Sequence, residues 1–559
     1  MPRRNNRRRA QNALEEDNSP LTPYLINFDE LDAYNENRLY ESQHQELRRS
    51  TTIDWNDADL FGDDDAAFVD IESLNSFSVV RTDCNKFFDP QYKFIVLNAP
   101  KGSGKTTMCR MLEFKINHKG GSSESAIWLR DPDISPKPTQ PIMLSDWIHR
   151  WCNHISYAIL CMLVEQIEGL ITDSDLIDIL DVKRSTGESS KGLLRQFTDN
   201  FKLPFLNNKS LPDKFKYSYQ DILVRVDKRL QKKAWIFIDE VDQGFSHEEQ
   251  LVFKNAAALI ACRQLASKFN NVVIRSTIRP NVLTVLQSNV DSVANVADSI
   301  VPLDWNALQL RSVVAKRVES YLSKTNNYFV KTFKSTDENE NWLLSQILKT
   351  EDPNMGLGSG KRPIHITLAI LGKNRPRWVL NLLKESAKIA KFNNESLITP
   401  AELFGSLKQY GHDRIKNIAA EFRSICDNIQ LIVAKLSLSD RSVFRHRELI
   451  AFIEKNILTS GDPIAITGGS RDASAIEIAE LLYLIGVIDA GYLAGESSVI
   501  GRESLKKMHM DFYDQPVLMS ALSISKQEIE KFIWEIHPAF RYALGLERKK
   551  WNKGRNHNR

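Results

Sequence analysis

Short apolar runs alternate with helical stretches through the middle of the chain. Runs that are apolar throughout are typical of parallel strands buried on both faces, and helical segments between them favour a βα alternation. Residues 76–325 therefore predict an α/β domain built on a parallel sheet. The five predicted strands are Phe94–Leu97, Ala126–Leu129, Ala234–Ile238, Val272–Arg275 and Ser299–Leu303.

Helical spacing of apolar residues predicts three further parts of the chain. Residues at about 137–230 predict a helical insertion in the α/β domain, with Trp147 and Trp151 in its core. Residues 326–420 predict a helical lid, in which Pro376 starts a helix. Residues 421–545 predict a winged-helix domain. Its expected parts are helices at Ser442–Ile457 and Ser474–Ile485, a wing at Gly491–Met508 and a closing segment at Ile533–Leu544.

The segment NAPKGSGKTT follows the first predicted strand and precedes a helix, which is the build of a nucleotide-phosphate loop. Its backbone amides and the helix N-terminus attract phosphate oxygens. We expect Lys105 to bind the β- and γ-phosphates of ATP and Thr106 to ligate Mg²⁺. Ala99 replaces the first Gly of the consensus, which suits the loop only if its φ is negative. The predicted nucleotide-binding residues here are Ala99, Pro100, Lys101, Gly102, Ser103, Gly104, Lys105, Thr106 and Thr107.

A second motif, WIFIDEVD, ends the third predicted strand in two carboxylates. Open α/β sheets bind ligands at the carboxyl ends of their strands. We therefore expect Asp239, with Thr106, to hold the metal, and Glu240 to activate water as a general base. An acidic pair after a core strand also occurs as a helix cap, but its coexistence with a phosphate loop favours the catalytic interpretation.

The chain has 559 residues, 42% of them apolar and 26% charged, and a net charge of +3, as is typical of a globular protein with several domains. No apolar stretch of about 18 residues predicts a membrane span, and scattered Cys favour a cytoplasmic location. Residues 1–75 predict a polar, largely disordered region with a basic arm at MPRRNNRRR, and residues 546–559 predict a basic tail. Both ends could bind nucleic acid non-specifically, although solvated tails are more common.

The ordered motifs APKGSGKTT, WIFIDEVD, VVIRSTIRP, IVPLDW and NRPRWVL resemble a bacterial P-loop ATPase family. That family is related to the STAND and origin-recognition-type ATPases, and many of its members are found in anti-phage defence loci. The resemblance covers about residues 80–545 and implies an additional-strand core, in which strand 4 lies between strands 1 and 3. One departure is Thr277, which stands where related chains often have Asp.

In this branch of ATPases, a polar residue at the tip of strand 4 senses the γ-phosphate, and Arg275 or Ser276 is the candidate. Arg275 would stabilise charge during phosphoryl transfer, or else pair with Asp242. Arg375 or Arg377 would contribute a second sensor from the lid, unless both lie on a solvated helix start. Residues 281–310 contain no Arg or Lys, which disfavours a ring motor with an arginine finger. The predicted catalytic set is Glu240, Asp239 and Arg275.

The leading functional interpretation is a slow or stimulated ATPase switch that uses ATP and Mg²⁺ and regulates a partner effector. The predicted second helix of the winged unit carries Glu477 and Glu480 but no base-reading cation. The wing carries Arg502, Lys506 and Lys507, so protein docking is favoured over sequence-specific DNA reading. One alternative is a DNA-binding ATPase of the origin-recognition or loader type. Another is a nucleotide-dependent assembly scaffold. Oligomerisation stays open.

Overall fold

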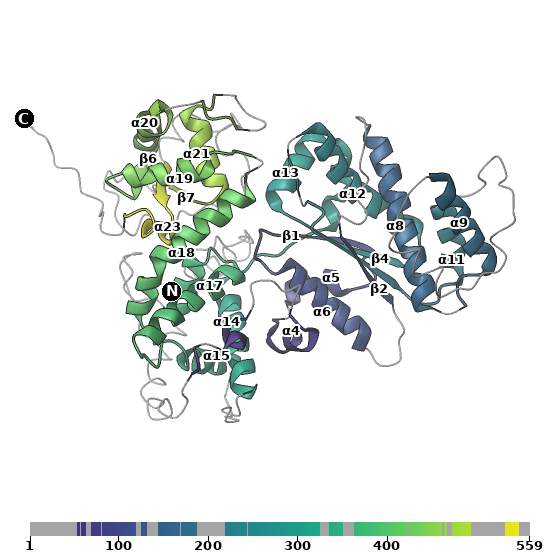
Figure 1. Cartoon of the computed structure of the whole chain (residues 1–559), viewed down its shortest axis with the longest axis horizontal. Coiled ribbons are helices and arrows are strands. Elements are labelled where there is room, and N and C mark those ends of the chain that lie inside the picture. The colour runs from purple at the N-terminus through teal and green to yellow at the C-terminus, as the bar shows by residue number, and fades with distance from the viewer. Residues whose placement is uncertain are drawn as a thin grey trace, which may run out of the picture.

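The computed structural model describes residues 53–546, apart from 56, 63–68, 80, 119–124, 131–142, 168, 187–217, 243, 247, 325–334, 350–362, 424, 461–462, 467–471 and 493–531. The chain forms two lobes, one built around a parallel sheet and one mainly helical (Figure 1). The basic arm, the basic tail from residue 547 and most of the predicted wing lie outside the described residues. None of the described helices is long and apolar enough to cross a membrane.

The sheet has five parallel strands in the order β2-β3-β4-β1-β5. Strand β4 therefore lies between β1 and β3, and the predicted additional-strand arrangement is confirmed. Every residue of β3 and β4 is buried, as expected for central strands of a parallel sheet that is covered on both faces. The strands are β1 (Phe94–Asn98), β2 (Ser125–Arg130), β3 (Ala234–Asp239), β4 (Val272–Ile278) and β5 (Ile300–Pro302).

Helices cover both faces of this sheet, and a separate hydrophobic core fills each side (Figure 1). The predicted insertion supplies α8, α9 and α11, and its Trp147 and Trp151 are buried in the core as expected. On one face lie α5 (Asn85–Phe88) and α6 (Lys105–His118). The helices associated with the other core are α8 (Leu144–Gln166), α9 (Asp173–Thr186), α11 (Tyr219–Arg229), α12 (Glu249–Lys268), α13 (Pro280–Asn289) and the 3-10 helix η3 (Asp291–Ser299).

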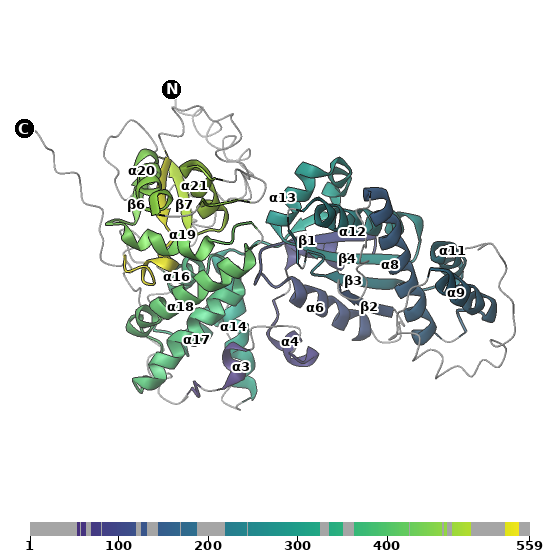
Figure 2. The same ribbon diagram turned by 45° about the horizontal axis from the view of Figure 1, so that its top comes forward.

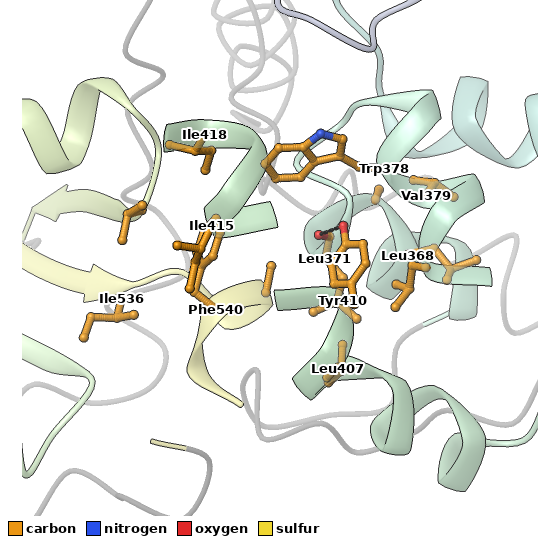
Figure 3. Packing of buried hydrophobic residues seen from close by; sticks show 14 of the residues in the cluster. Leu368, Leu371, Trp378, Val379, Leu407, Tyr410, Ile415, Ile418, Ile536 and Phe540 are labelled. Carbon is orange, nitrogen blue, oxygen red and sulfur yellow. Dashed lines mark hydrogen bonds between the residues drawn. The ribbon is translucent and has the colours of Figure 1, made fainter. Parts of the chain in front are cut away.

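The helical lobe begins earlier than the predicted boundary at residue 325, because α14 packs into its core. In that core the Tyr410 hydroxyl donates to the Leu371 carbonyl oxygen at 2.9 Å, and the rings of Trp378 and Phe540 meet edge to face at 6.4 Å (Figure 3). The helices are α14 (Ala307–Lys324), α15 (Thr336–Ser345), α16 (Ile364–Leu371), α17 (Pro376–Phe392) and α18 (Pro400–Glu421).

The C-terminal unit has a three-stranded antiparallel sheet in the order β6-β8-β7. The helix predicted at Ser442–Ile457 is too long, because Val443–Arg445 forms strand β6 and pairs with β8. This unit shares one continuous hydrophobic core with α14–α18. Its other elements are α19 (Ile429–Lys435), α20 (His446–Asn456), α21 (Ala475–Leu484), β7 (Ile488–Tyr492), β8 (Phe532–Ile536) and α23 (Pro538–Arg541).

Two short helices lie within the segment that the sequence predicted to be disordered. Helix α3 (Ala58–Phe61) packs against α14 and α17, and α4 (Ile71–Phe77) packs against α6 and α14 (Figure 2). Leu60 and Phe61 belong to the helical-lobe core, and Leu74 is also buried. The prediction is therefore wrong for these residues, because long-range burial of a few apolar side chains outweighs the polar composition around them.

Candidate functional site

The loop between β1 and α6 adopts the backbone conformation that a phosphate cradle needs. Gly102 and Gly104 have φ values of +84° and +88°, a region that favours glycine. Ala99 is buried without a positive φ, and its N–H donates to the Ile278 carbonyl oxygen of β4 at 3.2 Å. The substitution of Ala for the first Gly of the motif is therefore compatible with the loop.

Lys105 begins α6 and folds back over this loop. Its ammonium donates to the carbonyl oxygens of Ala99 at 2.7 Å and Pro100 at 3.3 Å. Burial lowers the pKa of Lys105, and the carboxylates of Asp242 and Asp239 oppose that shift. A cation that is bound only weakly by neutral carbonyls can transfer its hydrogen bonds to an anionic ligand.

The predicted metal residues meet across the sheet edge. The Thr106 hydroxyl donates to Asp239 Oδ2 at 2.7 Å, and the Thr277 hydroxyl donates to Asp239 Oδ1 at 2.5 Å. Asp239 is 8% exposed at the end of β3. One buried carboxylate with a hydroxyl beside it is the oxygen-donor set that Mg²⁺ takes at nucleotide sites, so the residues fit this ion.

Glu240 follows Asp239 in a left-handed conformation, with φ at +55°. Its N–H donates to the Thr277 hydroxyl at 3.0 Å, which fixes the turn. Desolvation within the pocket raises the pKa of Glu240, and the nearby charges of Asp239 and Asp242 raise it further. A non-glycine residue held in this region costs about 1–3 kcal/mol, and such strain concentrates at functional sites. A carboxylate with a raised pKa at the pocket edge is suited to accept a proton from water.

Arg275 does not take the position that the sequence suggested, and this is a correction. It lies in the middle of β4, paired with Ile95 and Phe237, and its side chain is fully buried. Its guanidinium donates to three carbonyl oxygens of α5 and the segment between α5 and β1, and stacks at 4.9 Å over the Trp235 ring. Arg275 does not line the pocket, so it is a structural residue. The three carbonyls belong to Phe87, Asp89 and Tyr92.

A cation that was not predicted, Arg279, lines the pocket at the start of α13. Its Nε donates to Asp242 Oδ2 at 2.7 Å, and its backbone N–H donates to the same oxygen at 2.8 Å. Burial alone would lower the pKa of Arg279, but the pairing with Asp242 raises it. The signal was the Arg-Pro dipeptide after β4, because Pro280 starts a helix and leaves Arg279 at the strand end.

The two lid arginines have different environments. Arg377 lines the pocket, and its backbone N–H donates to the Gly102 carbonyl oxygen at 3.2 Å. Arg375 lies 3.6 Å from the Glu421 carboxylate and stacks at 4.7 Å over the Trp378 ring. Of the two candidates, only Arg377 is placed to contact a ligand.

These residues surround a pocket of about 360 Å³. The lining combines charged side chains with apolar ones, and several of the apolar ones come from the N-terminal segment that was predicted to be disordered. Trp305 closes the loop side, with its indole N–H donating to the Ser103 carbonyl oxygen at 2.8 Å. The predicted residues that line the pocket are Lys101, Gly102, Gly104, Lys105, Thr106, Thr107, Asp239, Glu240 and Arg377. The apolar lining that was missed includes Phe61, Val69, Leu74, Phe77, Val79, Val313 and Leu380.

No protein-family model and no curated protein sequence matches the chain. Among solved structures, ORC1 of Aeropyrum pernix in complex with DNA has 14% identity and a TM-score of 0.32 over 74% of this chain and 86% of that chain. The ORC2 protein of the same organism has 10% identity and a TM-score of 0.35 over 81% and 87%. The RuvB branch migration motor of Thermotoga maritima has 11% identity and a TM-score of 0.26 over 65% and 81%.

The strand order and the glycine-rich loop define the class of the protein. A glycine-rich loop connects β1 to α6, and an acidic residue ends the strand beyond the inserted β4. The fold is therefore that of a P-loop NTPase with an additional-strand core and a helical lobe.

Proposed function

We propose that the protein is a switch that binds and hydrolyses ATP with Mg²⁺. The observation that carries this proposal is the convergence of Lys105, Thr106 and Asp239 on one pocket, which Arg377 of the helical lobe also lines beside the phosphate loop. A pocket lined by both cationic and apolar side chains suits a triphosphate joined to a nucleobase. Its contact with both lobes suits a switch, because a ligand there affects their relative position.

Each residue has a distinct role in this proposal. Lys105 and the loop amides bind the phosphates, while Thr106 and Asp239 hold Mg²⁺, which when bound neutralises charge on the phosphate oxygens. Glu240 accepts a proton from the attacking water. Arg279 takes the role of the charge-stabilising cation that was expected of Arg275, since it lines the pocket.

The test is nucleotide binding and turnover by three variants. Lys105→Ala should lose binding of a fluorescent ATP analogue, and Glu240→Gln should retain ATP without hydrolysing it. Lys115→Ala is the matched control, because Lys115 lies on the same helix but stacks on Phe88, away from the pocket. Failure of the wild-type protein to bind ATP, or unchanged turnover by Glu240→Gln, would contradict the proposal.

The partner effector and the setting in anti-phage defence rest on the sequence resemblance. Hydrolysis should be measured for the protein alone, with duplex DNA, and with the products of neighbouring genes. Stimulation by a neighbouring gene product supports the effector switch. Stimulation by DNA supports the origin-recognition or loader alternative, and binding without turnover in every condition supports an assembly scaffold.

A further inference from the structure

The turn between α16 and α17, taken here with the first two residues of α17 as residues 372–377, contacts the phosphate loop and the C-terminal unit at the same time. At one end, the Arg377 N–H donates to the Gly102 carbonyl oxygen at 3.2 Å. At the other, the Lys373 ammonium donates to the Gly486 carbonyl oxygen at 2.7 Å and lies 3.3 Å from Asp489 Oδ1. A segment of a few residues therefore connects the two regions.

This turn is held in one conformation. Lys373 and Asn374 have φ values of +48° and +52°, two successive non-glycine residues in the left-handed region. Such residues cost about 1–3 kcal/mol each and persist only where the surroundings fix them. Here the Asn374 N–H donates to Ala369 O at 3.0 Å and the Arg375 N–H donates to Gly372 O at 2.9 Å. A turn fixed in this way moves as a unit.

The contact of Lys373 is with the C-terminal end of α21. Gly486 lies two residues beyond the last residue of that helix, where backbone carbonyls carry partial negative charge. A lysine at this place lies near the negative end of the helix dipole, which attracts it. The side chains of Lys373 and Asp489 are each 15% exposed, so the contact is screened less than a surface pair.

A third contact links the turn to the end of α18. Arg375 faces Glu421, and both side chains are largely buried. The charge of Glu421 also acts on Lys105 and Arg279, where it opposes the effect of burial on the pKa of each cation. The turn thus lies within the same electrostatic environment as the phosphate site.

We propose that Lys373 is a positioning residue for the nucleotide site. By anchoring the turn to α21 and β7, it holds Arg377 against the phosphate loop, so a partner that binds the C-terminal unit changes nucleotide affinity. By linkage, nucleotide binding changes the affinity for that partner by the same factor. The inference rests on the proposed function, and it identifies the contact through which the switch operates.

The test compares Lys373→Met with Lys373→Arg, which keeps a cationic donor. Hydrogen exchange is followed in the phosphate loop without nucleotide, and affinity is measured with a non-hydrolysable ATP analogue. Lys373→Met should increase exchange of amides 99–107 and weaken binding about 5-fold or more, at the low end of typical coupling. Lys373→Arg should keep both the loop exchange and the nucleotide affinity close to those of the wild-type protein. Lys388→Met is the control, because Lys388 lies on α17 and pairs with Glu385 in its own helix.

Two outcomes separate this inference from the proposed function. If the wild-type protein binds nucleotide and Lys373→Met matches it in both affinity and loop exchange, the anchoring role is wrong. If the wild-type protein binds no ATP but Lys373→Met still increases loop exchange, the connection exists and the proposed function is wrong. A melting curve identifies loss of folding. In that case Asp489→Asn, which weakens the contact but keeps the carbonyl acceptor, should show the same changes at smaller size.

Discussion

Replacement of Arg275 by Met distinguishes a structural arginine from a catalytic one. Met fills much of the same apolar space but removes the charge and all donors. Burial lowers the pKa of Arg275 from its ordinary 12.5 to about 9, so at 1.36 kcal/mol per pKa unit the buried charge costs about 5 kcal/mol. Substitution relieves that cost.

The substitution also removes hydrogen bonds to three carbonyls outside β4. Hydrogen bonds from a charged donor contribute about 1.5–3 kcal/mol each, or about 4.5–9 kcal/mol for the three. The loss of these hydrogen bonds therefore ranges from about equal to the relief to about 4 kcal/mol above it. We expect Arg275→Met to lower the free energy of unfolding by about 2 kcal/mol, which corresponds to roughly 4–8 °C in the melting temperature of a sheet lobe of this size.

The assay pairs calorimetric melting with initial rates of ATP hydrolysis, measured well below the lower melting temperature. Arg275→Met should melt early and hydrolyse ATP at the wild-type rate. Arg279→Met is the comparison, because its side chain lines the pocket and pairs with Asp242. It should lose hydrolysis, which Arg275→Met retains. An Arg275→Met protein with wild-type melting and hydrolysis reduced about 100-fold would refute this reasoning.

Three further predictions concern the pocket. Because the pKa of Glu240 is raised, hydrolysis by the wild-type protein should fall with decreasing pH at values above the usual 4.5 of a glutamate. Glu240→Gln, which does not hydrolyse ATP, should melt no earlier than wild type near neutral pH, since the ionised carboxylate is the destabilised form. Thr277→Val removes the hydroxyl that accepts from the Glu240 N–H and donates to Asp239, and should lower the single-turnover rate about 10- to 100-fold, because both groups lose a buried partner. Gly102→Ala, at φ +84°, should weaken ATP-analogue binding about 10-fold in titrations, whereas Gly169→Ala, at φ +75° with open space around it, should not.

The parallel sheet and the phosphate loop could be predicted because their signals are local. A fully apolar run within a βα alternation predicts a buried strand, and a glycine-rich phosphate loop is identified from consecutive residues. The error at Arg275 came from a strand boundary. The strand was predicted to end at Arg275, but it continues to Ile278, so the residue at the tip of the strand is Arg279 rather than Arg275. Because the strand is three residues longer than predicted, Arg275 lies in the middle of the sheet and not at the pocket.

The apolar lining of the pocket could not be predicted either, and the reason is not a misplaced strand boundary. Phe61 and Phe77 lie in a stretch rich in Asp and Asn, and their burial depends on α14 and α17, which come more than 200 residues later. Local composition indicates the average polarity of a segment and not whether a distant surface covers two aromatic rings. The same limit applies to the lid, where the sequence left Arg375 and Arg377 as alternatives and only the packing against Gly102 separates them.

The shared core of the helical lobe and the C-terminal unit has a consequence for engineering. Helices α18 and α23 approach so closely that a methyl group placed on Gly411 would lie 2.8 Å from the Ala539 carbonyl oxygen. Domain exchange at residue 421 would therefore leave an uncovered apolar face on the helical lobe, and such faces promote aggregation. Chimeras that retain α18 together with its own terminal unit should remain monodisperse, whereas grafts of a foreign unit onto α18 should precipitate.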